Sequence, residues 1–265
     1  MNRAFALSLL LFAASALAAD KEFTPYSGQP GKDVVWVPTP PELVEKMLDM
    51  AKLTPKDYVI DLGSGDGRNV IAAAKRGAHG HGVEFNPDMV QLAQRTAEKE
   101  GVADKARFIQ GDMFEADISK ATVLPLFLLP DNLRKLKAKF QALRPGTRIV
   151  TNGYEIDGWE PEEVGKLTVN CTSWCTAYLY IVPPRVSGTW RLPEGQLRLE
   201  QDFQKLSGTL TANGQTVPIA HARLTGNRIS FTVGMNRYEG RVSGKEMSGR
   251  MNGRSSGYWK AVRAS

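Results

Sequence analysis

A run of nine residues, Val59 to Gly67, constrains the fold of this chain more than any other stretch. It reads Val-Ile-Asp-Leu-Gly-Ser-Gly-Asp-Gly, so an apolar strand leads directly into three glycines at alternate positions, Gly63, Gly65 and Gly67. Glycine lets the backbone turn sharply and approach a ligand without a Cβ in the way. A helix that begins near Arg68 would point its N–H groups at the same place. The run therefore predicts a strand, a ligand-binding turn and a helix, as in α/β domains.

The spacing of these glycines also bears on the ligand. Dinucleotide-binding turns have the pattern G-x-G-x-x-G, whereas this chain has Asp61-x-Gly63-Ser64-Gly65-x-Gly67. An acidic residue just before the turn suits a ligand with a positively charged ammonium end better than a pyrophosphate, and Asp61 would lie beside that cation. The spacing therefore disfavours an NAD-type dehydrogenase.

Strand-like and helix-like segments alternate along most of the chain up to residue 183, which is typical of a parallel sheet with helices on both faces. Thr39-Pro40-Pro41-Glu42 should start the first helix with Thr39 as its cap, because a proline occupies the first turn and Glu42 follows the cap by three residues. It should end before Pro55. The expected strands are 58–62, 80–84, 106–110, 121–129, 147–151 and 176–182, and the expected further helices are 69–76, 87–100 and 130–143.

Acidic residues end the second and third of these strands as well. Glu84 follows the glycine turn by about 20 residues, where a carboxylate can accept hydrogen bonds from two ribose hydroxyls. After the third strand come Gly111, Asp112 and Met113. There the carboxylate can accept from an adenine amino group and the methionine can cover the ring. Because the carboxyl ends of parallel strands meet at one edge of a sheet, Asp61 and these two acids should converge on one ligand pocket.

These motifs resemble those of class I S-adenosylmethionine-dependent methyltransferases, whose fold is α/β with a Rossmann-like seven-stranded sheet. Asp61-x-Gly63-x-Gly65-x-Gly67 resembles the first motif of that family, Glu84 its ribose acid and Gly111-Asp112 its adenine-binding turn. Over roughly residues 33–183 the chain is more closely similar to the small lysine methyltransferases that modify the c-subunit of ATP synthase, and to their bacterial relatives. The segments that carry this similarity are Trp36-Val37-Pro38-Thr39-Pro40, Asp61 to Arg68, Leu128-Leu129-Pro130, Arg144 to Val150 and Trp159-Glu160-Pro161.

The resemblance implies S-adenosyl-L-methionine as the cofactor and suggests a protein lysine as the methyl acceptor. Such a lysine must lose its ammonium proton, and an apolar channel lowers the pKa of an amine by desolvation. Candidate walls for that channel are Trp36, Leu126, Phe127 and Leu128, and no catalytic residue is assigned. The residues expected at the cofactor are Trp36, Asp61, Gly63, Ser64, Gly65, Gly67, Glu84, Gly111, Asp112 and Met113.

Nucleic acid is disfavoured as the acceptor. Methyltransferases that act on nucleobase amines commonly resemble one another in an Asp/Asn-Pro-Pro-aromatic turn after the fourth strand, where this chain has Leu128-Leu129-Pro130-Asp131. His81 and His221 are expected to be structural, since neither ends a strand at the predicted site.

After Pro183-Pro184 helical spacing gives way to short alternating runs between glycine turns, which predicts a small all-β barrel or sandwich. Residues 181–265 hold 13 basic and 5 acidic residues, against 34 and 28 in the whole chain, so the net charge of +6 arises here. An anionic partner or a simply solvated basic surface would account for this charge. The predicted divisions are a signal peptide at 1–19, an extended lead-in at 20–35, the methyltransferase domain at 36–183 and the basic β-rich domain at 184–265.

The first nineteen residues have the pattern of a cleaved secretory signal. Arg3 gives a positive start, residues 4–12 are apolar apart from Ser8, and Ala16-Leu17-Ala18 fits the cleavage rule. The apolar run is too short to span a bilayer comfortably, so the mature chain should have no transmembrane helix. Export, most simply to the periplasm, would place Cys171 and Cys175 where they could pair, although two small buried thiols are equally consistent with the sequence. No histidine cluster accompanies them, and no metal site is expected.

Export is at odds with a cofactor that is made in the cytosol. Either the signal is misread, or the cofactor reaches the exported site, or the domain no longer transfers methyl groups. The last case leaves an exported, non-enzymatic binding or envelope protein with a methyltransferase fold as the alternative function.

Overall fold

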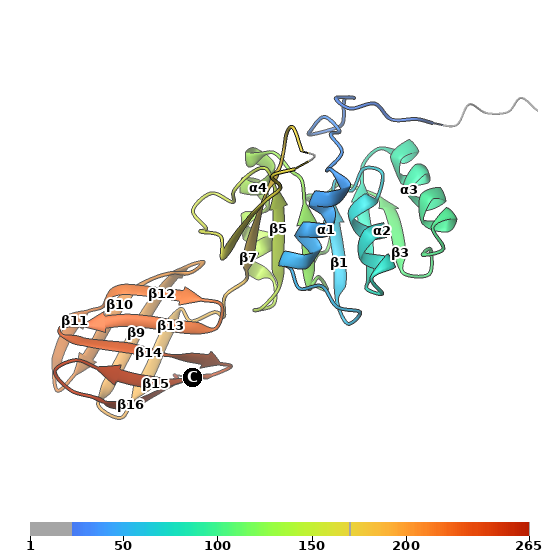
Figure 1. Ribbon diagram of the computed structural model, residues 1–265. Helices are drawn as coiled ribbons and strands as arrows, with labels where there is room; N and C mark the ends of the chain where they lie inside the picture. The colour runs from blue at the N-terminus through green and yellow to red at the C-terminus, as the bar shows by residue number, and fades with distance from the viewer. Residues whose placement is uncertain (1–22, 170, 265) are drawn as a thin grey trace, which may run out of the picture.

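The computed structural model describes residues 23–169 and 171–264. The predicted signal peptide at 1–19 lies outside the described residues. Two separate β-sheets organise the rest, a seven-stranded sheet that ends at Ile181 and a second sheet that begins at Gly188 (Figure 1). Within the described part of the chain, no helix is both long enough and apolar enough to cross a bilayer.

The first sheet has the strand order β3-β2-β1-β4-β5-β7-β6. The strands β1 to β5 are parallel, and β7 pairs antiparallel with both β5 and β6. Because the order reverses between β1 and β4, a crevice opens at the carboxyl ends of these strands. The bounds are β1 Tyr58–Leu62, β2 His79–Glu84, β3 Ala106–Gln110, β4 Val123–Leu126, β5 Arg148–Asn152, β6 Glu163–Lys166 and β7 Thr176–Ile181.

Helices cover both faces of this sheet (Figure 1). On one face lie α1 Pro41–Met50, α2 Arg68–Lys75 and α3 Pro87–Lys99, and on the other lies α4 Pro130–Ala142. Successive side chains of β1 point to opposite faces of the sheet. Val59 therefore packs in the core under α1, whereas Ile60 and Leu62 pack with α4. The seven-stranded α/β fold expected from the sequence is therefore confirmed.

The second sheet closes on itself and forms a barrel of eight antiparallel strand positions. Consecutive strands pair except for β11 and β12, which both pair with β10 and share one position beside it. The strand β16 pairs back with β8. Its interior is filled by large side chains, among them Trp190, Phe231, Tyr238 and Trp259. The bounds are β8 Gly188–Leu192, β9 Gly195–Asp202, β10 Lys205–Ala212, β11 Gln215–Pro218, β12 Ala220–Thr225, β13 Arg228–Val233, β14 Asn236–Ser243, β15 Glu246–Asn252 and β16 Gly257–Arg263.

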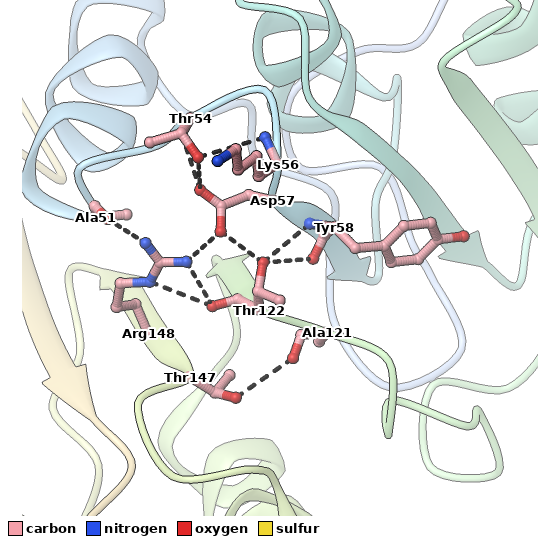
Figure 2. A network of polar contacts seen from close by, with 9 residues as sticks. All are labelled: Ala51, Thr54, Lys56, Asp57, Tyr58, Ala121, Thr122, Thr147 and Arg148. Atoms are coloured by element: carbon pink, nitrogen blue, oxygen red, sulfur yellow. Dashed lines mark hydrogen bonds and ion pairs between the residues drawn. The ribbon is translucent and has the colours of Figure 1, made fainter.

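A polar network ties together the amino ends of β1, β4 and β5 (Figure 2). Asp57 Oδ1 accepts a hydrogen bond from Thr122 Oγ1 at 2.8 Å and pairs with the Arg148 guanidinium, while Asp57 Oδ2 accepts from the Thr54 backbone N–H at 2.8 Å. Burial alone would raise the pKa of Asp57, but these hydrogen bonds outweigh it and lower the pKa below its ordinary value. The network holds together the amino ends of these three strands, at the end of the sheet opposite the crevice.

Three local predictions were wrong. The N-cap of α1 is Pro40, not Thr39, because the Thr39 hydroxyl instead accepts a hydrogen bond from Asn152 Nδ2 at 3.2 Å. The fourth strand covers only Val123–Leu126 within the predicted 121–129, since the chain leaves the sheet before α4. Residues 20–35 were expected to run extended, but the described part turns at 27–28 and folds back so that Gln29 bridges Trp36.

Candidate functional site

One pocket lies at the carboxyl ends of the parallel strands. Asp61, Glu84 and Asp112, from the ends of β1, β2 and β3, all line it, so the three carboxylates face the same space. We call this part of the pocket the acidic end. The other expected cofactor residues that line the pocket are Trp36, Gly63, Ser64, Gly111 and Met113.

The glycine turn contributes to the pocket at only one of its three glycines. All three have positive φ, at +69° for Gly63, +54° for Gly65 and +81° for Gly67, which other residues rarely adopt. Gly63 lines the pocket, but a Cβ on Gly65 would lie 2.5 Å from Trp36 Nε1, and one on Gly67 would lie 2.5 Å from the ring of Phe108. The second and third glycines therefore make room for packing rather than for a ligand.

Asp61 is the most deeply buried carboxylate of the pocket, at 2% exposed. Burial raises its pKa well above the ordinary value, although Asn69 Nδ2 donates to Asp61 Oδ2 at 3.0 Å. Asn69 Oδ1, on the same amide, has no hydrogen-bond partner among the described residues, and neither has Ser64 Oγ, which packs against Gly82. A ligand that places a positive charge beside Asp61 would stabilise this buried carboxylate.

Glu84 is held by two backbone N–H groups. Its Oε2 accepts from Gly65 N and its Oε1 from Asn86 N, both at 2.9 Å. The first of these bonds joins the end of β2 to the glycine turn after β1. Each oxygen keeps a second lone pair, so the carboxylate can still accept from a ligand's hydroxyl groups.

Asp112 already has a cationic partner. Lys32 pairs with Asp112 Oδ2 and lies 4.9 Å from the centroid of the Phe85 ring, while Asp112 Oδ1 accepts from Phe114 N at 2.8 Å. The lysine hydrogen bond and the Phe114 N–H lower the pKa of Asp112. Lys32 was not predicted as a site residue, because it belongs to residues 20–35, which we expected to be an extended lead-in to the domain.

Residues 29–39, which we call the roof segment, line one side of the pocket. Besides the Lys32 contact, the roof segment is fixed at Thr39, whose carbonyl oxygen accepts from Arg68 Nη1 at 2.6 Å. Arg68 also pairs with Asp66 in the glycine turn, at 2.5 Å. The roof segment is therefore tied to the first turn of α2 and to the end of β3.

From β4 onward the pocket is lined by aromatic and apolar side chains instead of carboxylates. Phe127 follows β4, Tyr154 follows β5, and Trp174 lies in the connection from β6 to β7. The Trp174 ring centroid is 5.5 Å from that of Phe127 and 5.2 Å from that of Tyr154. We call this part the aromatic end; Leu128 and Leu129 extend its apolar wall. Leu126, by contrast, is fully buried in the core and is not a wall residue.

Neither expected structural histidine is at the site. His81 Nδ1 lies 3.1 Å from the Tyr58 hydroxyl, and burial lowers its pKa. His221 lies in β12, in the barrel.

Comparisons with known proteins identify the family to which this chain belongs. The family model described as the ANTKMT methyltransferase domain matches residues 61–163. A protein-lysine N-methyltransferase of Saccharolobus islandicus is 43% identical over 152 residues, which make up 56% of this chain and 94% of that protein. The chain belongs to this family of S-adenosylmethionine-dependent methyltransferases. The family resemblance predicted from the sequence is thus confirmed.

The methyltransferase has other relatives with different acceptors in their names. The ATP synthase c-subunit lysine N-methyltransferase of Xenopus laevis is 32% identical over 130 residues, 49% of this chain and 57% of that protein, so the chain spans little more than half of this relative. A crystal structure described as an RNA methyltransferase from Salinibacter ruber in complex with S-adenosyl-L-homocysteine has 43% identity and a TM-score of 0.53, and the match covers 57% of this chain and 96% of that one.

The acidic end fits the cofactor of this methyltransferase family. S-adenosylmethionine has a cationic amino group and a cationic sulfonium, and the buried Asp61 with its raised pKa is the kind of group that a cation stabilises. The orphaned Asn69 Oδ1 offers an acceptor beside it.

Proposed function

We propose that this chain is an exported protein-lysine N-methyltransferase. The observation that carries the proposal is the division of one pocket into an acidic end over β1 to β3 and an aromatic end over β4 to β7. A cofactor held at the acidic end would direct its methyl group toward the aromatic end. The names of the relatives at 43% and 32% identity support lysine as the acceptor.

In this proposal each carboxylate holds one part of the cofactor. Asp61 lies beside the amino group, with Asn69 as its hydrogen-bond partner. Glu84 accepts from the ribose hydroxyls, because Gly65 and Asn86 have already fixed its orientation. Asp112 accepts from the adenine amino group, with Met113 against the ring. Gly65 and Gly67 act indirectly, through packing.

The aromatic end prepares the acceptor. When bound, S-adenosylmethionine supplies an electrophilic methyl group, and the acceptor nitrogen must present a lone pair to it. Contact with Leu128 and Leu129 removes water from the acceptor amine, which lowers its pKa and favours the neutral nucleophile. The described residues that line this end include no histidine or carboxylate, so positioning and desolvation carry the step.

Calorimetry with S-adenosylhomocysteine on the mature chain tests the cofactor site. We expect Glu84→Ala to weaken binding about ten- to a hundredfold, because hydrogen bonds to a charged group contribute about 1.5–3 kcal/mol. The control is Asp131→Ala, at an exposed position on α4 outside the pocket, which should bind like the unmodified chain. No detectable binding by the unmodified chain would end the proposal.

An RNA acceptor is the second candidate. It is favoured by the description of the Salinibacter ruber structure and by the basic C-terminal barrel. Envelope and whole-cell extracts incubated with the protein and methyl-labelled S-adenosylmethionine separate the two. Label that survives ribonuclease and is released by protease supports lysine; the reverse supports RNA.

The compartment is part of the proposal. Residues 1–19 have the pattern of a secretory signal, and the bond between Cys171 and Cys175 is of a kind that persists in oxidising compartments. N-terminal sequencing of the protein from periplasmic and cytosolic fractions tests it, and a full-length chain in the cytosol would refute it. The basic barrel would serve to hold an anionic partner; binding to anionic vesicles or heparin that is lost at high salt tests this role.

A further inference from the structure

We infer that Trp174, Phe127 and Tyr154 form a binding subsite for the methylated ammonium group of a lysine side chain, and that Trp174 is its specificity-determining residue. The inference rests on the proposed function and adds the chemistry by which the acceptor is recognised. Four features of the structure lead to it.

The first feature is the position of the three rings along the sheet. The strand order runs from β3, where Asp112 lies, through β2 and β1 to β4, β5 and β7. The cofactor's adenine and ribose partners are at the β3 and β2 positions, so the aromatic end is where the cofactor's reactive group and the acceptor must meet.

The second feature is the chemistry of the rings. Aromatic faces attract ammonium groups, and more so when the groups carry methyl substituents and the site is dry. A lysine that accepts more than one methyl group is already a methylated ammonium after the first transfer. Leu128 and Leu129 supply the apolar surface that its aliphatic stem needs.

The third feature is the contact of Trp174 with the backbone. A Cβ on Gly153 would lie 2.8 Å from Trp174 Cε3, so the indole lies directly on a residue without a side chain. Yet Trp174 remains 37% exposed and is one of the residues that line the pocket. The indole is thus supported from behind and presented to a ligand.

The fourth feature is the backbone of the loop. Trp174 has a φ of +57°, an unusual value for a bulky residue that persists where the surroundings impose it. The loop is closed by the disulfide between Cys171 and Cys175, and Cys175 O accepts from Leu167 N at 2.9 Å. The disulfide therefore acts as a positioning element for the indole.

The test uses the mature chain saturated with S-adenosylhomocysteine. Two probes are titrated by NMR: N-acetyl-trimethyllysine methylamide, and the neutral analogue in which a tert-butyl group replaces the trimethylammonium. The two have the same shape and differ in charge. We expect the cation to bind roughly three- to tenfold more tightly than the neutral analogue.

Variants at position 174 complete the design. Trp174→Leu should lose the preference for the cation, Trp174→Phe should keep part of it, and both should bind S-adenosylhomocysteine within about twofold of the unmodified chain, as the measure of intact folding. Equal binding of the two probes by the unmodified chain, or an unchanged preference in Trp174→Leu, would overturn the inference. Failure to bind S-adenosylhomocysteine at all would instead refute the proposed function.

Discussion

The indole of Trp159 stacks on the phenyl ring of Phe203, with ring centroids 4.0 Å apart and planes inclined by 17°. Trp159 belongs to the loop between β5 and β6, and Phe203 to the turn between β9 and β10, so the contact joins the sheet to the barrel. Both side chains are buried, at 2% and 3% exposed. Beside them, Gln204 Nε2 donates to Glu160 O at 3.1 Å. The barrel thus completes the core of the methyltransferase domain.

Phe203→Ala should therefore destabilise the methyltransferase domain and not only the barrel. We expect a loss of about 3–5 kcal/mol in the free energy of unfolding, as for other buried aromatic truncations. Urea unfolding followed by intrinsic fluorescence measures it. Tyr258→Ala, on an 82% exposed barrel position, is the matched control. A loss no larger than that of the control would show that the two units do not share a core.

The Asp57 network predicts a dependence of stability on pH. The pKa of Asp57 in the folded protein is lowered below its ordinary value of 3.8. The ionised side chain therefore contributes fully to the free energy of unfolding above about pH 3.8, and this contribution is lost as the pH falls through the folded-state pKa. Asp57→Asn should cost about 1.5–3 kcal/mol at pH 7 and should flatten the acid limb below about pH 4. Unfolding midpoints measured from pH 7 to pH 3 test this, with Asp131→Asn as an exposed control.

The pairing of Lys32 with Asp112 predicts a small, salt-sensitive effect on the cofactor. Lys32→Ala frees the end of the roof segment, so S-adenosylhomocysteine should dissociate faster. An exposed ion pair changes an equilibrium by no more than about fivefold, and added salt should shrink the difference. Stopped-flow dissociation at two ionic strengths measures it. An effect that is larger and independent of salt would mean that Lys32 contacts the cofactor itself.

The disulfide should matter more for acceptor binding than for stability. Cross-linking so short a loop contributes about 2 kcal/mol at most in the chain-entropy account. The double variant Cys171→Ser, Cys175→Ser should therefore stay folded and bind S-adenosylhomocysteine normally, while its affinity for the trimethyllysine probe falls severalfold. NMR titration of both ligands checks this. Unchanged probe affinity would show that the loop holds Trp174 without the disulfide.

Much of the fold was predictable because local signals and the final fold agree. The strands 58–62 and 106–110 were placed to the residue, and Asp61, Glu84 and Asp112 share one pocket because parallel strands must end on the same side. The strand β6 was not located, because Glu163–Lys166 has only one buried residue and no alternation that marks a strand.

Residues that reach the pocket from distant segments could not be predicted in this way. Lys32 and Trp174 are positioned by loops, and periodicity says nothing about where a loop folds back. The one available signal for Trp174 was its place between the two cysteines, four positions apart. Thr39 has the residue type and spacing of a helix cap, but its hydroxyl accepts a hydrogen bond from Asn152, which is distant in the sequence.

The roof segment precedes the first helix in the chain, yet it lines the same pocket as Trp174, which lies between β6 and β7. A cofactor bound in this pocket would therefore contact residues that precede α1, outside the strands and helices of the sheet. Removing residues 29–39 would consequently take away one wall of the pocket while leaving every strand of the sheet in the chain.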